Sequence, residues 1–230
     1  MATILNIETS TSVCSVALTK DGAVEFHKEN YQNMSHATNL GVFVEEALEF
    51  AKKNELKLDA VSVSCGPGSY TGLRIGVSEA KGLCFGLNIP LIAINTLKVI
   101  TCNVMFSGNF NEDALFCPMI DARRMEVYSA IYNNAFEEIK PVSADIIDEN
   151  SYKDILDKNI VYFFGDGASK CETIINHPNA RFIQSVLPVA VDMTALSDLA
   201  FRKSDFKDVA YFEPFYLKEF VTTTSKKKVI

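Results

Sequence analysis

A glycine-rich segment, CGPGSYTGLRIGVSEAKGLCFG at residues 65–86, follows the short apolar run 61–64 and holds six of the chain's 11 glycines. The backbone N–H groups around Gly68 and Ser69, together with a helix N-terminus, could bind a phosphate or another anion. The same glycines could instead permit positive φ angles and close approach of strand and helix. The spacing matches neither the P-loop nor the dinucleotide-binding motif. We therefore favour the structural interpretation.

Polar side chains also gather where the first predicted strand ends, at Glu8, Thr9 and Ser10. A carboxylate beside two hydroxyls could act as a general acid or base, or could bind a cofactor. Alternatively, Glu8 simply accepts hydrogen bonds from the amides of the turn. No second acid or metal-ligating cluster accompanies it, so the structural role is favoured. Glu8, Thr9, Ser10, Gly68 and Ser69 remain the candidates for cofactor binding, and no catalytic residue is predicted.

Metal ligands and activated nucleophiles are not evident in the sequence. His27, His36 and His177 are far apart, and none belongs to an HxxxH or HExxH pair. His36, near a helix start, is expected at the surface or in a cap. Ser69 has no GxSxG context and no neighbouring base that would activate it. The sequence therefore predicts no metal site.

A charged turn occupies residues 121–124, with Asp121 followed by Arg123 and Arg124. Aspartate and arginine at this spacing could orient one another, because a guanidinium binds a carboxylate through paired hydrogen bonds. They could also face a cleft between two halves of the protein. Structural pairing within the turn is the favoured interpretation.

The elements that position these residues follow one pattern in each half of the chain. Alternating hydrophobicity and turn signals predict three antiparallel strands, a helix, a strand with a glycine corner, a helix and a final strand. In the first half Ser35 is expected to cap the first helix. The predicted elements there are strands 3–8, 13–19, 23–29, 61–64 and 89–94, and the helix 72–87. In the second half they are strands 115–120, 126–132, 161–164 and 181–183, and helices near 149–158 and from Ala168.

Two copies of such a unit indicate a duplicated α/β fold with mixed five-stranded sheets flanked by helices. The arrangement resembles the actin, Hsp70 and sugar-kinase architecture (the ASKHA, RNase H-like fold). In those relatives the turn after the first strand holds nucleotide phosphates. We expect one subdomain at 1–98 and a second at 99–203. The last helix, about 192–203, and the tail 204–230 could pack back on the first subdomain.

The helix 72–87 has an ordinary core face and an unusual second face. Helical periodicity predicts that its core face contains Leu73, Val77, Ala80, Cys84 and Leu87. Small and apolar side chains away from that face would let another backbone approach closely. The alternative is that another element of the same chain covers them. The residues predicted to form a partner interface are Arg74, Ile75, Ser78, Glu79, Gly82, Phe85 and Gly86.

Composition limits the possible partners and the compartment. The 230 residues carry a net charge of −7, whereas a protein that binds tRNA or DNA alone usually presents a basic field. The 6 cysteines include no CxxC pair, which favours reduced thiols in the cytoplasm. No apolar run is long enough to cross a membrane. We expect neither a membrane association nor independent binding of nucleic acid.

Long motifs resemble the TsaB (YeaZ) family of bacterial tRNA threonylcarbamoyladenosine biosynthesis proteins. They are ILNIETSTSVCSVAL at 4–18, the segment CGPGSYTGLRIGVSEAKGLCFGLNIPLIAINTL at 65–97, MIDARRMEVYSAIY at 119–132, FFGDGASK at 163–170 and EPFYLKE at 213–219. Glu8 stands where the family often has Asp, and Tyr70 where Phe is usual. The turn ETSTS also lacks the glycine of nucleotide-binding relatives, which argues against independent ATP binding.

The resemblance implies a non-catalytic scaffold or activating subunit that acts beside the anticodon of tRNAs reading codons that start with A. It implies pairing with TsaD, which transfers the threonylcarbamoyl group, and with itself, and assembly with the ATPase TsaE. ATP or ADP and metal are then expected on the partner subunits, and tRNA contact only through the complex. Two alternatives stay open: a metal-dependent glycoprotease-like peptidase and an ATP-dependent small-molecule kinase.

Overall fold

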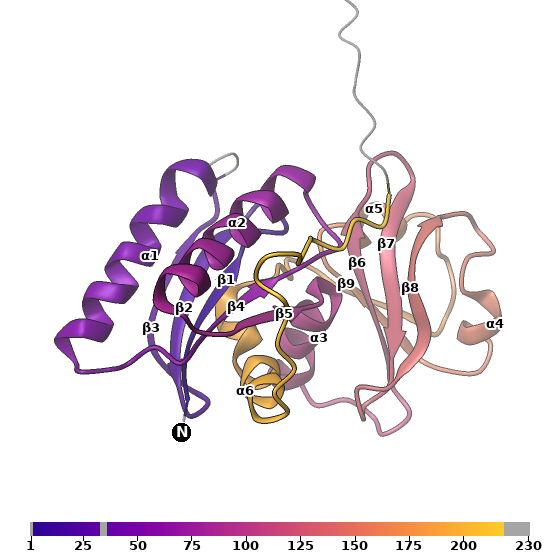
Figure 1. Cartoon of the computed structure of the whole chain (residues 1–230). Coiled ribbons are helices and arrows are strands. Elements are labelled where there is room, and N and C mark those ends of the chain that lie inside the picture. The colour runs from indigo at the N-terminus through magenta and orange to yellow at the C-terminus, as the bar shows by residue number, and fades with distance from the viewer. Residues whose placement is uncertain (1, 33–35, 219–230) are drawn as a thin grey trace, which may run out of the picture.

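A computed structural model describes residues 2–32 and 36–218 of the chain. The predicted cap Ser35 and the end of the tail, 219–230, lie outside these ranges. Two sheets stand beside one another, and the helices α3 (Thr96–Ser107) and α6 (Thr194–Arg202) lie between them (Figure 1). None of the helices in the described ranges combines the length and apolarity that crossing a bilayer requires.

The first sheet has the strand order β3-β2-β1-β4-β5, with β1, β2 and β3 antiparallel and β4 and β5 parallel to β1. One face packs against α1 (His36–Lys53) and α2 (Tyr70–Leu87), which bury an aliphatic core. The strands are β1 (Thr3–Glu8), β2 (Cys14–Lys20), β3 (Ala23–Asn30), β4 (Ala60–Ser64) and β5 (Leu91–Ile94). Every residue of β1 and β4 is buried, including the polar residues Asn6 and Glu8 of β1 and the serines of β4.

The second sheet has the order β10-β9-β6-β7-β8, which is the same order as the first sheet read from its other edge. The strands are β6 (Leu115–Asp121), β7 (Glu126–Tyr132), β8 (Glu138–Ile146), β9 (Val161–Phe164) and β10 (Ala180–Ile183). Short helices α4 (Lys153–Leu156) and α5 (Ala168–Cys171) complete this half, and the 3-10 turn η1 (Ala190–Met193) leads into α6. The predicted duplicated α/β fold is confirmed.

Two predicted helices of the second half are shorter than expected. The segment predicted as a helix at 149–158 is helical in α4 alone, and the helix from Ala168 ends after the single turn of α5. Ile155 and Leu156 of α4 and Ile175 after α5 still pack against the second core. The glycine corner Gly165–Gly167 nevertheless lies at the predicted place between β9 and α5.

The helix α2 begins two residues earlier than predicted. Ser69 is its N-cap, and the Ser69 hydroxyl accepts a hydrogen bond from the Gly72 N–H at 3.3 Å. The predicted core face is confirmed for Leu73, Val77, Ala80 and Cys84. Leu87 is half exposed, because the helix ends there with Asn88 in the left-handed conformation at φ 52°.

The last helix lies on the first sheet. In α6 the buried Ser197 Oγ lies 2.6 Å from Asn6 Oδ1 of β1 and 2.8 Å from Ser62 Oγ of β4. Ala200 of α6 and Met193 of η1 join an apolar cluster with β1, β4 and β5. This packing fixes α6 against the first unit, although it follows the second unit in sequence.

The chain then returns across the first unit as a strap, which we define as residues 204–218. Lys207 forms an antiparallel bridge with Leu91, and Lys81 Nζ of α2 donates to the carbonyls of Ala210 and Phe212 at 3.1 and 2.9 Å. At its end Lys218 forms an ion pair with Glu126 of the second sheet. The strap therefore links the outer side of α2 to the second unit (Figure 1).

Candidate functional site

The glycine-rich segment from Gly66 to Gly72 packs directly against the turn after β1. A Cβ at Gly68 would stand 2.3 Å from the Ser10 carbonyl oxygen, and one at Gly72 would stand 2.0 Å from the Thr9 carbonyl oxygen. Ser69 N–H donates to the Ser10 carbonyl at 2.6 Å, and Thr9 Oγ1 donates to the Gly72 carbonyl at 2.8 Å. These glycines thus serve close approach of α2 to the first sheet.

The same contacts bury three of the predicted cofactor-binding residues. Glu8, Thr9 and Ser10 are fully buried, while Gly68 is half-buried and Ser69 is exposed. Glu8 Oε1 accepts a hydrogen bond from Ser10 N–H at 2.5 Å, as the structural interpretation expects. Burial raises the pKa of the Glu8 carboxyl, against the opposing effect of its hydrogen bonds with Ser10. A ligand at the surface cannot reach these three side chains in this arrangement, and cofactor binding there stays a prediction.

The histidines lie at three separate places. His36 is buried rather than at the surface, which corrects the prediction: its ring Nε2 lies 2.8 Å from the Thr11 carbonyl oxygen and ties α1 to the turn after β1. His177 pairs with Asp157 at 3.3 Å in the second unit, and His27 lies on β3. Among the described residues no three His, Cys, Asp or Glu side chains come together as a group that could hold a metal ion.

The predicted pairing of Asp121 with an arginine is wrong. Asp121 forms an ion pair with Lys170 of α5, which also donates to the carbonyls of Arg124 and Glu126 at 2.8 and 2.7 Å. The Arg123 backbone N–H donates to Asp121 Oδ1 at 2.9 Å, but both arginine side chains are exposed. The fold brings α5 next to this turn, although Lys170 lies 49 residues further along the chain than Asp121. Lys170 is therefore the partner of Asp121.

The outer face of α2 is where the predicted interface residues lie. Phe85 is 84% exposed, and a Cβ at Gly82 or Gly86 would meet no other atom. The exposed members of the predicted set are Arg74, Ser78, Gly82, Phe85 and Gly86. Ile75 and Glu79 are half-buried, and Ile75 packs partly against the first core. Glycine within a helix costs about 1 kcal/mol of stability relative to alanine. Because no neighbouring atom would meet a side chain at 82 or 86, packing within the chain does not explain glycine at either position.

The strap shapes one flank of this face. Arg74 lies 4.3 Å from the centre of the Tyr70 ring, and its Nε donates to the Tyr216 hydroxyl of the strap at 3.3 Å. The rings of Tyr70 and Tyr216 are 4.8 Å apart. The other flank is a groove of about 510 Å³ between α1 and α2, lined by apolar side chains such as Leu48 and Leu83 and by four charged ones, Glu45, Glu49, Lys52 and Glu79. Aromatic and arginine side chains are enriched in protein interfaces.

A larger groove of about 760 Å³ lies between α3 and α6. Asp192 is among its lining residues, and Asn103 Nδ2 donates to both carboxylate oxygens at 3.1 Å. Burial raises the pKa of Asp192 to about 6.

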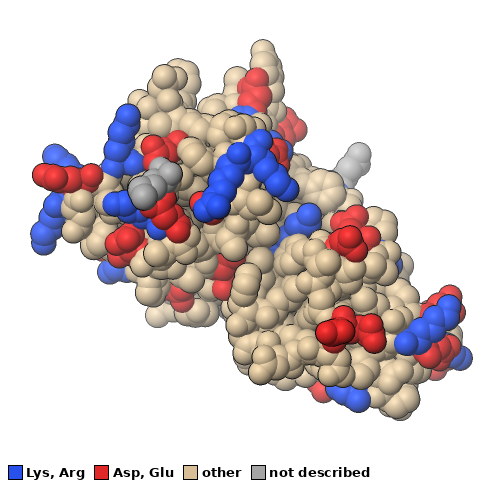
Figure 2. Space-filling view, turned by 90° about the horizontal axis from the view of Figure 1, so that it is seen from below, with Lys and Arg blue, Asp and Glu red and all other residues tan. Residues whose placement is uncertain are grey.

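On the face seen from below, Lys and Arg are interspersed with Asp and Glu, so that face carries no extended positive surface (Figure 2).

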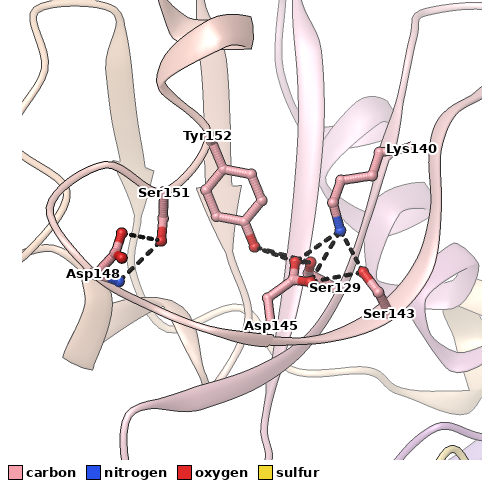
Figure 3. A network of polar contacts seen from close by, with 7 residues as sticks. All are labelled: Ser129, Lys140, Ser143, Asp145, Asp148, Ser151 and Tyr152. Atoms are coloured by element: carbon pink, nitrogen blue, oxygen red, sulfur yellow. Dashed lines mark hydrogen bonds and ion pairs between the residues drawn. The ribbon is translucent and has the colours of Figure 1, made fainter.

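A polar network crosses the second sheet around Asp145. This carboxylate accepts hydrogen bonds from Lys140 at 2.8 Å, Ser129 at 2.6 Å and Tyr152 at 2.7 Å, and Ser143 also donates to it (Figure 3). Burial alone would raise the pKa of Asp145, but the four donors outweigh it and lower the pKa. The network fixes β7, β8 and the start of α4 together.

Comparison with known proteins assigns this duplicated fold to a family. The family model described as "TsaD: tRNA N6-adenosine threonylcarbamoyltransferase" matches residues 30–218, which is more than half of the chain. The chain therefore belongs to the TsaD family.

Several of its curated relatives are TsaB proteins. The "tRNA threonylcarbamoyladenosine biosynthesis protein TsaB" of Bacillus subtilis is 34% identical over 142 residues, which cover 60% of this chain and 60% of the relative. The TsaB of Escherichia coli is 36% identical over 56% of this chain and 54% of the relative. The aligned region thus spans little more than half the length of these two relatives. The TsaB of Haemophilus influenzae is 26% identical over 96% of this chain and 95% of that protein.

Solved structures give the same result for the fold. A Pseudomonas aeruginosa protein "with similarity to peptidase YEAZ" superposes with a TM-score of 0.81 at 24% identity, covering 95% of this chain and 100% of that one. The structure "YeaZ from Pseudomonas aeruginosa" superposes with a TM-score of 0.73 at 25% identity, covering 94% and 100%. The predicted resemblance to TsaB (YeaZ) is confirmed.

Proposed function

We propose that this chain is a scaffold or activating subunit for threonylcarbamoyl transfer to N6 of adenosine beside the anticodon of tRNA. The names of its TsaB relatives and the TsaD family match support a role in this tRNA modification. The chain acts in the cytoplasm with TsaD and TsaE and has no independent activity. ATP or ADP and metal belong to the partner subunits, and tRNA is bound by the complex.

The exposed face of α2 is the observation that carries the proposal. Phe85 projects into solvent beside Gly82 and Gly86, which leave open space where a side chain would otherwise stand. A helix with this composition lets a second helix pack at close range and buries an aromatic anchor between them. We infer that TsaD docks on this face, and that a second copy of the chain uses the same face when TsaD is absent.

Reconstitution tests the proposal. The chain alone is expected to neither transfer threonylcarbamoyl nor hydrolyse ATP, and to be required when TsaD and TsaE of the same organism are supplied. Gly82→Arg places a long cation in the open space of the face, whereas Asn150→Arg adds the same charge to an exposed turn of the second unit. Pairing with TsaD, measured by calorimetry, should be lost in the first variant and kept in the second. Transfer by the chain alone would contradict the proposal.

A further inference from the structure

The turn between β6 and β7 holds two consecutive arginines in an unusual backbone conformation. Arg123 has φ 67° and Arg124 has φ 51°, and the Ala122 N–H donates to the Glu126 carbonyl at 3.1 Å, so the hairpin loop contains three residues. Gly and Asn adopt a positive φ most readily, because a Cβ crowds the backbone there. Arginine at both positions is therefore unfavourable for folding.

The fold gives these arginines no compensating contacts of their side chains. Both side chains are exposed, and within residues 2–32 and 36–218 neither guanidinium forms a hydrogen bond or an ion pair. Only their backbone atoms are fixed, since Arg123 N–H donates to Asp121 and the Arg124 carbonyl accepts from Lys170. The turn thus presents two guanidiniums from a hydrogen-bonded backbone at one end of the central strands β6 and β7 of the second sheet.

Of the described residues, three acids lie near this turn, and two of them are paired with lysines. Asp121 is paired with Lys170, and Glu126 is paired with Lys218 of the strap. The third acid, Asp166, accepts the Asp121 N–H at 2.9 Å and is directed toward the backbone. Among the described residues, neither Arg123 nor Arg124 therefore has a carboxylate partner of its own. A site of this kind attracts an anion.

We propose that Arg123 and Arg124 bind backbone phosphates of the tRNA held by the complex. The planar guanidinium fork matches phosphate oxygens and forms paired, charge-assisted hydrogen bonds with them. The chain has a net charge of −7 and cannot attract RNA by its overall field, so its contact with tRNA must be local. The inference rests on the proposed function and adds a direct tRNA contact to it.

The double variant Arg123→Asn/Arg124→Gly tests the inference. Asn and Gly adopt a positive φ more readily than Arg, so the variant is expected to unfold at no lower a temperature than the wild type. The matched control Lys158→Gln/Arg181→Gln removes two positive charges from exposed positions elsewhere in the second unit. Each protein is assembled with TsaD and TsaE, and the affinity for substrate tRNA is measured by fluorescence anisotropy over a range of salt concentrations.

The complex that contains the Arg123→Asn/Arg124→Gly variant should bind tRNA about tenfold more weakly at low salt. The slope of its log association constant against log salt concentration should be shallower by about 1.5. The control should change neither quantity. Equal tRNA affinity and slope in wild type and Asn-Gly variant would overturn the inference, as would a loss confined to binding of free ATP or ADP. A loss explained by weaker pairing with TsaD, measured separately, would also overturn it. If the wild-type complex did not need the chain for transfer, the proposed function would fail, and this inference with it.

Discussion

The carbonyl oxygen of Thr9 occupies the place that a side chain at Gly72 would need: a Cβ there would lie 2.0 Å from it. The Thr9 hydroxyl also donates to the Gly72 carbonyl at 2.8 Å, so the two backbones are held in direct contact. This contact sets the position of α2 on the first sheet. It also fixes which side of α2 remains outside.

Two alanine substitutions should have opposite effects on stability. Gly72→Ala forces the Thr9 backbone to move and should lower the free energy of unfolding by about 1–3 kcal/mol or more. Gly82→Ala, ten residues along the same helix, meets open space and should raise it by about 0.5–1 kcal/mol. Urea unfolding of both variants measures the difference. Stabilisation by Gly72→Ala would contradict the packing described for the glycine corner.

The strap should loosen when its contacts with Lys81 are removed. Lys81 donates to two strap carbonyls, and the strap has few buried apolar side chains of its own. In Lys81→Met we expect amide hydrogen exchange within 204–218 to be several-fold faster, while global stability falls by no more than about 1 kcal/mol. Lys57→Met, at an exposed position after α1, serves as the control. Unchanged exchange in the strap would show that its other contacts suffice.

Asp192 should make stability depend on pH in the mildly acidic range. Burial raises the pKa of Asp192 in the folded protein from the ordinary value of 3.8 to about 6. The unfolded chain therefore releases this proton at lower pH, and the free energy of unfolding falls as the pH rises between these two pKa values. In Asp192→Asn this loss disappears. Across this pH range the free energy of unfolding of the variant therefore rises relative to that of the wild type by on the order of 2 kcal/mol, allowing for partial exposure. Urea unfolding at about pH 4.5 and about pH 7.5 measures it.

Asp113→Asn, at an exposed position, is the control for this experiment. It should shift stability equally at both pH values. A gain for Asp192→Asn that is the same at both pH values would mean that Asp192 titrates normally in the folded protein.

Local patterns predict much of the fold. Alternation defines the buried strands, and Asp21-Gly22 marks the first hairpin, where both residues have positive φ. Periodicity also separates the core face of α2 from its outer face. The predicted start of α2 was late because Gly72 suggested a corner, whereas Ser69 already caps the helix.

The features that sequence reasoning missed join residues far apart in the chain. Arg74 meets Tyr216 across 142 positions, and Lys170 meets Asp121 across 49. No periodicity links such residues, because the contacts arise only when two sheets and the strap assemble. The burial of His36 is similar: its partner, Thr11, lies 25 residues earlier on another element.

The central claim is that the outer face of α2 docks TsaD and that this docking supports transfer. The most direct measurement is the rate of threonylcarbamoyl incorporation into tRNA by TsaD and TsaE, with the wild-type chain or Gly82→Arg at equal concentration. We expect incorporation with the wild-type chain, at least tenfold less with Gly82→Arg, and full incorporation with Asn150→Arg. Equal incorporation with Gly82→Arg and wild type, at concentrations where the wild-type chain is required, would contradict the claim.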